Sequence, residues 1–124
     1  MSLHALIIED DVSMVDSVEQ ALRGAGYYSF DIAFSASEAI AAAYRRCPDI
    51  ITANLRLVDG SGVDVVLEIC SGQAIPVIFI TSLRSEIDKH IRGAIIVEKP
   101  FVADDIAAAC ALAVATPFSS PAAY

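Results

Sequence analysis

Polar side chains suited to holding a metal ion and a phosphoryl group follow four apolar segments of this 124-residue chain. They are Glu9, Asp10 and Asp11, then Asn54, then Thr81 and Ser82, and finally Glu98 and Lys99, which Pro100 follows. Adjacent carboxylates with oxygen ligands from a second loop suit Mg²⁺, a hard cation that prefers carboxylates, carbonyls and waters. A hydroxyl at Thr81 and an ammonium at Lys99 would hold the oxygens of a phosphoryl group that the metal also touches. The residue types therefore indicate phosphoryl chemistry, provided that the fold brings the four segments together.

Four of these residues also have a simpler structural interpretation. Glu9, Asp10 and Asp11 would cap the helix that follows them, and Lys99 would neutralise their charge. This interpretation is favoured for any one residue taken alone. Because all four segments contribute to one phosphoryl-handling set, the combination favours a site.

The segments that must position these residues alternate between strand and helix patterns. Short β-rich apolar segments recur at residues 5–8, 28–34, 50–53, 77–80 and 94–97. Helical patterns lie at about 13–23, from 35 to before Pro48, after the turn at 59–62, near 84–91, and from after Pro100 to about 115. Strands that are apolar on both faces and alternate with helices predict an α/β fold, a (βα)5 doubly wound domain with a five-stranded parallel sheet. Ligands of such sheets bind beyond the carboxyl ends of the strands, so the polar residues are expected to converge there.

The length leaves room for one domain. We expect the domain over residues 4–115, and residues 116–124, with two prolines and two serines, as a flexible tail or the start of a linker.

Charge and hydropathy exclude several classes of protein. Hydrophobic residues make up 56% of the chain and charged residues 19%, which is typical of a compact globule and not of a disordered chain. A net charge of −8 repels phosphate backbones, so direct nucleic-acid binding is not expected. The longest apolar run, residues 106–115, is too short to span a membrane, and residues 1–4 do not resemble a signal peptide. We therefore expect a cytoplasmic protein without a membrane anchor.

Metal or disulfide chemistry based on cysteine and histidine is not expected. The three cysteines, Cys47, Cys70 and Cys110, form no C-x-x-C pair and lie in helices or at helix ends, which indicates buried reduced thiols. The two histidines, His4 and His90, are far apart in the chain and do not suggest a metal site.

Taken in order, the motifs resemble the receiver domain of two-component response regulators, the CheY-like family. The matching segments are 6–11, 48–54, 57–62, 76–82 and 98–101. The resemblance implies the flavodoxin-like or CheY-like strand order 2-1-3-4-5, with Glu9 and Asp10 as the metal-binding acidic pair. It also implies that Thr81 contacts the phosphate, that Lys99 pairs with the phosphoryl acceptor, and that the peptide bond after Lys99 is cis. The short segment between Thr81 and Lys99 is most similar to the alphaproteobacterial branch linked to general stress signalling.

The acceptor position departs from the receiver pattern. Receiver domains accept the phosphoryl group on an Asp at the end of the third strand, and the matching residue here is Asn54. The turn at residues 59–62 fixes this register. A neutral amide oxygen is a far poorer nucleophile than a carboxylate, so phosphorylation at position 54 is expected to be absent.

The missing negative charge also affects the metal and the lysine. The Mg²⁺ ligands that the resemblance implies are Glu9, Asp10, the Asn54 amide oxygen and the backbone carbonyl of Arg56. We expect these ligands to bind Mg²⁺ more weakly than a set with an aspartate. Lys99 loses its anionic partner and is expected to turn towards Glu9, Asp10 or Glu98.

Three explanations of Asn54 remain open. The chain is a natural pseudo-receiver, or Asn54 is an engineered block to phosphorylation, or another carboxylate accepts the phosphoryl group. The third explanation is least favoured, because Asp49 is expected at the wrong end of its strand and Asp59 is more simply explained by the Asp-Gly turn, leaving Asp10 as a remote option. The unusual Val58 favours natural divergence, although the sequence does not separate the first two explanations.

Functions of different classes compete. The leading hypothesis is a signalling module, not an enzyme, that contacts a histidine kinase or phosphotransfer protein and an output protein. The resemblance implies that the fourth and fifth helices and the fifth strand form the output face. The rivals are a Mg²⁺-dependent phosphotransferase or phosphohydrolase of similar fold, and a dimerisation module of a larger signalling protein, which keeps a homodimer open. The chain lacks the D-x-D motif and the glycine-rich loops that enzymes and nucleotide-binding proteins of similar architecture need.

Overall fold

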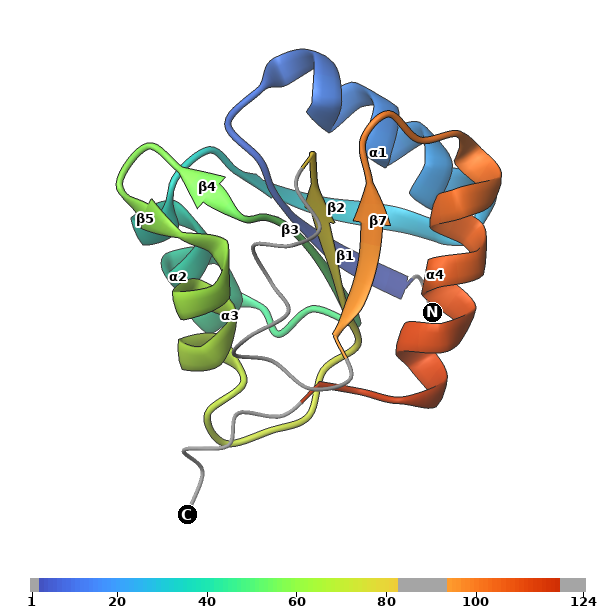
Figure 1. Cartoon of the computed structure of the whole chain (residues 1–124). Coiled ribbons are helices and arrows are strands. Elements are labelled where there is room, and N and C mark those ends of the chain that lie inside the picture. The colour runs from blue at the N-terminus through green and yellow to red at the C-terminus, as the bar shows by residue number, and fades with distance from the viewer. Residues whose placement is uncertain (1–2, 83–93, 119–124) are drawn as a thin grey trace.

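The computed structural model describes residues 3–82 and 94–118, which form a five-stranded parallel sheet flanked by helices (Figure 1). The strands of this sheet are β1 (Leu3–Ile8), β2 (Tyr27–Ala33), β3 (Ile50–Asn54), β6 (Val77–Thr81) and β7 (Ile95–Glu98). The helices are α1 (Val12–Gly24), α2 (Ala36–Arg45), α3 (Gly62–Ile69) and α4 (Ala103–Ala115), and a short hairpin of β4 (Arg56–Leu57) and β5 (Gly60–Ser61) precedes α3. The strand order β2-β1-β3-β6-β7 is the predicted order 2-1-3-4-5, so the fold prediction is confirmed. The helix predicted near residues 84–91 lies outside the described residues.

Helices cover both faces of the sheet (Figure 1). On one face, α1 and α4 share a hydrophobic cluster with strand residues such as Ile7 and Ile78. On the other face, α2 and α3 share a second cluster with Leu6 and Phe79. Neighbouring residues of one strand therefore enter opposite clusters, as expected of central strands buried on both faces. None of the helices in the described part of the chain is long and apolar enough to cross a membrane.

Two side chains of the segment itself, those of Ser35 and Glu38, bind the backbone at the start of α2. Ser35 Oγ accepts the Glu38 N–H at 3.2 Å, which satisfies one of the free donors of the first turn. The Glu38 carboxylate reaches back to the N–H of Phe34 at 2.9 Å and not to that of Ser35. The Glu38 side chain therefore binds the backbone at Phe34, one residue before the cap residue Ser35.

The Asp59 side chain, in the turn of the β4–β5 hairpin, also caps α2. Its Oδ1 accepts the Ala36 N–H at 2.6 Å, and its Oδ2 accepts the Ser37 N–H at 3.3 Å. These hydrogen bonds, above all the one from Ala36, hold the pKa of Asp59 below its ordinary value of 3.8. Turn chemistry alone was therefore an incomplete interpretation of Asp59, because its carboxylate joins the hairpin to a helix far away in the chain.

We expect Asp59→Asn to make stability less dependent on pH. A carboxyl group with a lowered pKa in the folded state stabilises the protein above its unfolded-state pKa, and this contribution is lost as the pH falls through the folded-state value. The variant should therefore be less stable than the natural chain at neutral pH, and the difference should shrink as the pH falls below 3.8. Urea denaturation across this pH range measures the effect, with the exposed Asp16→Asn as a matched control. A difference that stays constant with pH would contradict the assignment.

The packed part of the chain extends beyond the predicted boundary at residue 115. Phe118 pairs with Ile75 through two backbone hydrogen bonds, of 2.9 and 2.8 Å. Its ring meets Phe79 edge-on, with the ring centroids 6.1 Å apart. Phe118, which the sequence assigned to a tail, thus packs against the hydrophobic cluster that α2 and α3 cover, because its aromatic side chain has an apolar partner there.

The cysteines differ in burial. Cys70 and Cys110 are buried as predicted, and burial raises the pKa of each thiol to about 11. Cys47 is exposed, and the prediction was wrong there. The residue follows the end of α2 in a surface loop, where its thiol faces the Gln73 side chain at 3.3 Å.

Among the residues that the structure describes, the hydroxyl of Thr52 in β3 has no hydrogen-bond partner, although the residue is only 1% exposed. Its strand neighbours in register are Ile7 and Ile78. Because a buried hydroxyl without a partner lowers stability, we expect Thr52→Val to raise the free energy of unfolding by about 1 kcal/mol. Thr52→Ser, which keeps the hydroxyl and removes the methyl group, should lower it. Chemical denaturation measures both, and a Val variant less stable than the natural chain would show that the hydroxyl is satisfied.

Candidate functional site

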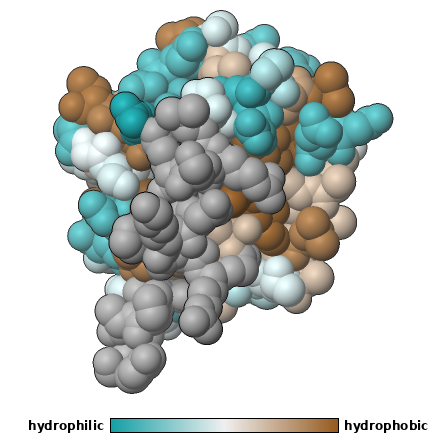
Figure 2. Space-filling view, in the orientation of Figure 1, coloured by the Kyte–Doolittle hydropathy of each residue, from teal (hydrophilic) through white to brown (hydrophobic). Residues whose placement is uncertain are grey.

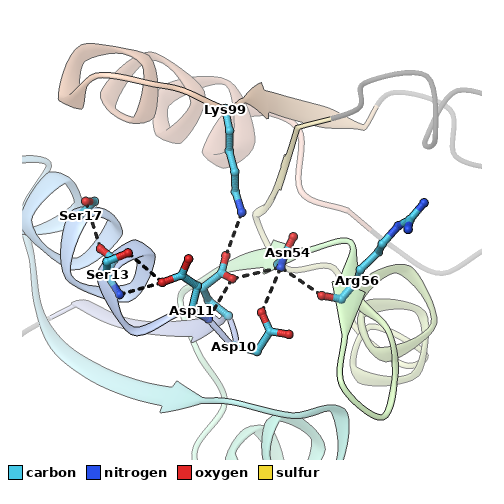
Figure 3. A network of polar contacts seen from close by, with 8 residues as sticks. Asp10, Asp11, Ser13, Ser17, Asn54, Arg56 and Lys99 are labelled. Carbon is cyan, nitrogen blue, oxygen red and sulfur yellow. Dashed lines mark hydrogen bonds and ion pairs between the residues drawn. The ribbon is translucent and has the colours of Figure 1, made fainter.

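The carboxyl ends of four neighbouring strands bring the predicted polar residues to one edge of the sheet. Glu9 and Asp10 follow β1, Asn54 ends β3, Thr81 ends β6, and Lys99 follows β7. The strands β1, β3, β6 and β7 are paired in this order and run parallel, so these ends lie side by side. Figure 3 shows Asp10, Asn54 and Lys99 pointing towards a common centre from three of these elements. The predicted convergence is confirmed.

The amide group of Asn54 is at the centre of the hydrogen-bond network. Its Nδ2 donates to Glu9 Oε1 at 3.0 Å and to the backbone carbonyl oxygen of Arg56 at 3.0 Å, with a longer contact of 3.5 Å to Asp10 Oδ1. An amide nitrogen carries two hydrogens, so it makes two good hydrogen bonds and one weak contact. The nitrogen faces the three oxygens because the amide oxygen in its place would leave four acceptors facing one another.

The Glu9 carboxylate is almost completely buried, at 2% exposure, and both of its oxygens have partners. Oε1 accepts from Asn54 and from the Asp11 N–H at 3.3 Å, and Oε2 pairs with Lys99 Nζ at 3.4 Å. Burial raises the pKa of Glu9, while the positive charge of Lys99 acts in the opposite direction. Lys99 turns to Glu9, one of the three partners expected for it.

Backbone geometry at the end of β7 places the lysine. The Lys99–Pro100 peptide bond is cis, as the resemblance implied. The Lys99 N–H donates to the carbonyl oxygen of Thr81 at 2.8 Å, so the loop after β7 is fixed to the end of β6. Thr81 is itself buried, at 4% exposure. Thr81 and Lys99, the predicted hydroxyl and ammonium residues, therefore lie at the ends of neighbouring strands that a backbone hydrogen bond joins.

Asp11 has a different role from its two acidic neighbours. Its Oδ1 accepts the Ser13 N–H at 3.0 Å and the Ser13 hydroxyl at 2.7 Å, which caps α1. These hydrogen bonds hold the pKa of Asp11 below its ordinary value. The capping interpretation is thus correct for Asp11, whereas Glu9 and Asp10 face Asn54.

Gly62, the first residue of α3, is a site residue that the sequence analysis treated only as part of a turn. A Cβ atom at this position would overlap the backbone carbonyl oxygen of Asn54 and lie 2.9 Å from its carbonyl carbon. The Gly62 N–H donates to the Leu55 carbonyl oxygen at 2.8 Å. The close approach of α3 therefore constrains the backbone at position 54. In the sequence, only the Asp-Gly-Ser-Gly turn pointed to this role of Gly62.

Comparison with known proteins establishes the class. Residues 5–111 match the response regulator receiver domain. The chain therefore belongs to the receiver domain family of two-component response regulators.

Within this class, the chain is similar to stress response regulators of the PhyR type. It is 31% identical over 112 residues to the phyllosphere-induced regulator PhyR of Methylorubrum extorquens, which covers 87% of this chain and 42% of that protein. The solution NMR structure of the PhyR receiver domain of Erythrobacter litoralis matches with a TM-score of 0.84 at 27% identity, covering 95% of this chain and 94% of that one. PhyR of Brucella abortus matches with a TM-score of 0.81 at 31% identity, covering 92% and 48%. The chain spans less than half the length of the curated relatives it matches, and the predicted resemblance to the general-stress branch is confirmed.

Receiver domains generally bind Mg²⁺, but the donor set of this chain does not fit the ion as it is arranged. Mg²⁺ needs oxygen ligands at about 2.0–2.1 Å in octahedral geometry. Here a nitrogen that donates hydrogens lies among the oxygens of Glu9, Asp10 and Arg56. Within residues 3–82 and 94–118, no group of three or more His, Cys, Asp and Glu side chains is arranged to hold a metal ion.

Proposed function

We propose that this receiver domain signals by protein–protein contact and is not phosphorylated at position 54. The observation that carries the proposal is the Asn54 amide, whose nitrogen donates to Glu9 Oε1 and to the Arg56 carbonyl oxygen. An aspartyl phosphate requires a carboxylate at this position, and the chain offers a neutral donor instead. In this proposal the domain binds partners and does not turn over a substrate.

The positions of the two other carboxylates considered as acceptors support the same conclusion. Asp59 is engaged with the N-terminus of α2, as described above. Asp49 lies at the start of β3, where its Oδ2 accepts the His4 N–H at 2.7 Å. Because β3 runs from there towards the site, Asp49 is at the opposite edge of the sheet. Neither residue is a convincing substitute acceptor.

The partners follow from the class and from the relatives. Response regulators receive signals from kinases and act on output partners. For this chain we propose a histidine kinase or phosphotransfer protein as the input partner and a separate output protein. PhyR of Bartonella quintana is described as an anti-anti-sigma factor, which suggests an anti-sigma factor in the pathway of this chain as well.

The surface between β7 and α4 supports an output contact. An open groove of about 510 Å³ lies there, lined by apolar residues such as Ile95, Ile96 and Leu112 and bordered by Glu98 and Asp105. Figure 2 shows hydrophobic side chains gathered over these two elements. An apolar groove with an acidic border favours a partner that presents apolar side chains flanked by basic ones. A second copy of this acidic chain fits the groove less well.

The proposed function includes a cellular location and an affinity for Mg²⁺, both expected from the sequence. We propose a cytoplasmic domain whose affinity for Mg²⁺ is lower than that of a receiver with an aspartate at position 54. The loss of one ligand charge is the physical reason.

Incubation of the chain with acetyl phosphate and Mg²⁺, followed by intact-mass measurement, tests the proposal. We expect no phosphoryl adduct. A stable adduct would overturn the proposal, and peptide mapping would then identify the residue that carries it.

A further inference from the structure

The Asn54 amide joins three oxygens that come from the loop after β1 and from β4. Asn54 Nδ2 lies 3.0 Å from Glu9 Oε1, 3.0 Å from the Arg56 carbonyl oxygen and 3.5 Å from Asp10 Oδ1. In these contacts the partially positive amide hydrogens face two carboxylates and a carbonyl. The loop after β1 and the start of the β4–β5 hairpin are thus held together by a side chain at the end of β3.

The buried carboxylate of the site has its partners without an added ion. Glu9 is the buried member of the acidic pair, and its two oxygens accept from Asn54, from the Asp11 N–H and from Lys99. Asp10 is exposed and therefore solvated. An aspartate at position 54 would add a third carboxylate at about 3 Å from the first, which water and Lys99 alone would stabilise poorly. The amide removes that repulsion.

We propose that the Asn54 amide takes the place of the divalent cation, so that this receiver keeps its site assembled without Mg²⁺. The inference rests on the proposed function, since it describes a domain that needs no metal for phosphorylation. For Mg²⁺ to enter, the amide would have to rotate and present its oxygen, which breaks the hydrogen bonds to Glu9 and Arg56.

The sequence offers a direct probe, because Asn54 is the only asparagine of the 124 residues. Selective ¹⁵N labelling of asparagine side chains gives one NH₂ signal pair, which reports this amide alone. We expect the pair to be unchanged by EDTA and by MgCl₂ at concentrations that saturate the Asn54→Asp variant. A shift of the pair that saturates over the same concentration range as the variant would show that the ion enters the site as readily, and would overturn the inference.

Thermal unfolding gives an independent measurement. The natural chain should unfold at the same temperature in EDTA and in MgCl₂. Asn54→Asp should unfold at a lower temperature in EDTA and gain roughly 5–10 °C with saturating MgCl₂, because a ligand that binds only the folded state stabilises it. Asn54→Ala, which removes the amide without adding charge, should be destabilised in both conditions. A natural chain that gains as much from MgCl₂ as the Asp variant would contradict the inference.

The two proposals fail in different ways. If Mg²⁺ shifts the Asn54 signal but acetyl phosphate adds no phosphoryl group, the replacement of the cation is wrong and the contact-only function stands. If a phosphoryl adduct forms on the natural chain, the contact-only function is wrong.

Discussion

Replacing Asn54 by Asp is expected to convert a domain without a phosphoryl adduct into one that acetyl phosphate readily modifies in the presence of Mg²⁺. The new carboxylate would stand next to Glu9 and Asp10, within reach of the Lys99 ammonium, which now lies 3.4 Å from Glu9. Its oxygen would attack the phosphorus of acetyl phosphate, and acetate would leave with the electrons of the broken P–O bond. Intact-mass measurement with and without Mg²⁺ quantifies the adduct.

The natural chain and Asn54→Ala serve as controls for this gain. If only the Asp variant is modified, the remaining residues of the site are competent and Asn54 alone prevents the reaction. If the Asp variant stays unmodified although it folds, the site lacks more than its acceptor. That outcome would contradict our prediction while leaving a contact-only role in place.

Gly62→Ala is expected to destabilise the protein by about 3 kcal/mol, at the upper end of the cost of overpacking. The added methyl group would overlap the backbone carbonyl oxygen of Asn54, and backbone cannot rotate away as a flexible side chain can. Relief requires α3 to move from β3, which would also weaken the hydrogen bond from the Gly62 N–H to Leu55. For a domain of this size, the midpoint of thermal unfolding should fall by roughly 10 °C.

Gly72→Ala is the matched control for the glycine prediction. No atom of the described residues lies within 4 Å of a Cβ at that position, and its backbone does not have a positive φ. This variant should therefore unfold close to the natural chain. Equal stability of the Gly62 and Gly72 variants would show that α3 shifts without cost.

Local patterns in the sequence were sufficient to predict the architecture. Runs such as Val77–Ile80 are apolar on both faces and predict central strands, which the structure has. Once parallel strands were predicted, the convergence of Glu9, Asn54 and Lys99 followed from topology alone. The sequence also determined the main chemical fact, because the absence of a carboxylate at position 54 is a property of one residue type.

The tertiary structure decided which of several available partners each polar group takes. Lys99 had three candidate acids and pairs with Glu9, because the two side chains meet only after β1 and β7 are placed in the same sheet. Asp59 was assigned to a turn and instead caps α2, and Phe118 was assigned to a tail and instead meets Phe79. Each of these contacts joins residues far apart in the chain.

The orientation of the Asn54 amide is the most consequential of these decisions. The sequence predicted its oxygen as a metal ligand, whereas the structure presents its nitrogen to Glu9 and to the Arg56 carbonyl oxygen. The residue type alone determined that the side chain at position 54 carries no charge. The choice between donor and acceptor depends on which oxygens surround the amide in space, and the folded loops after β1 and β3 supply those oxygens.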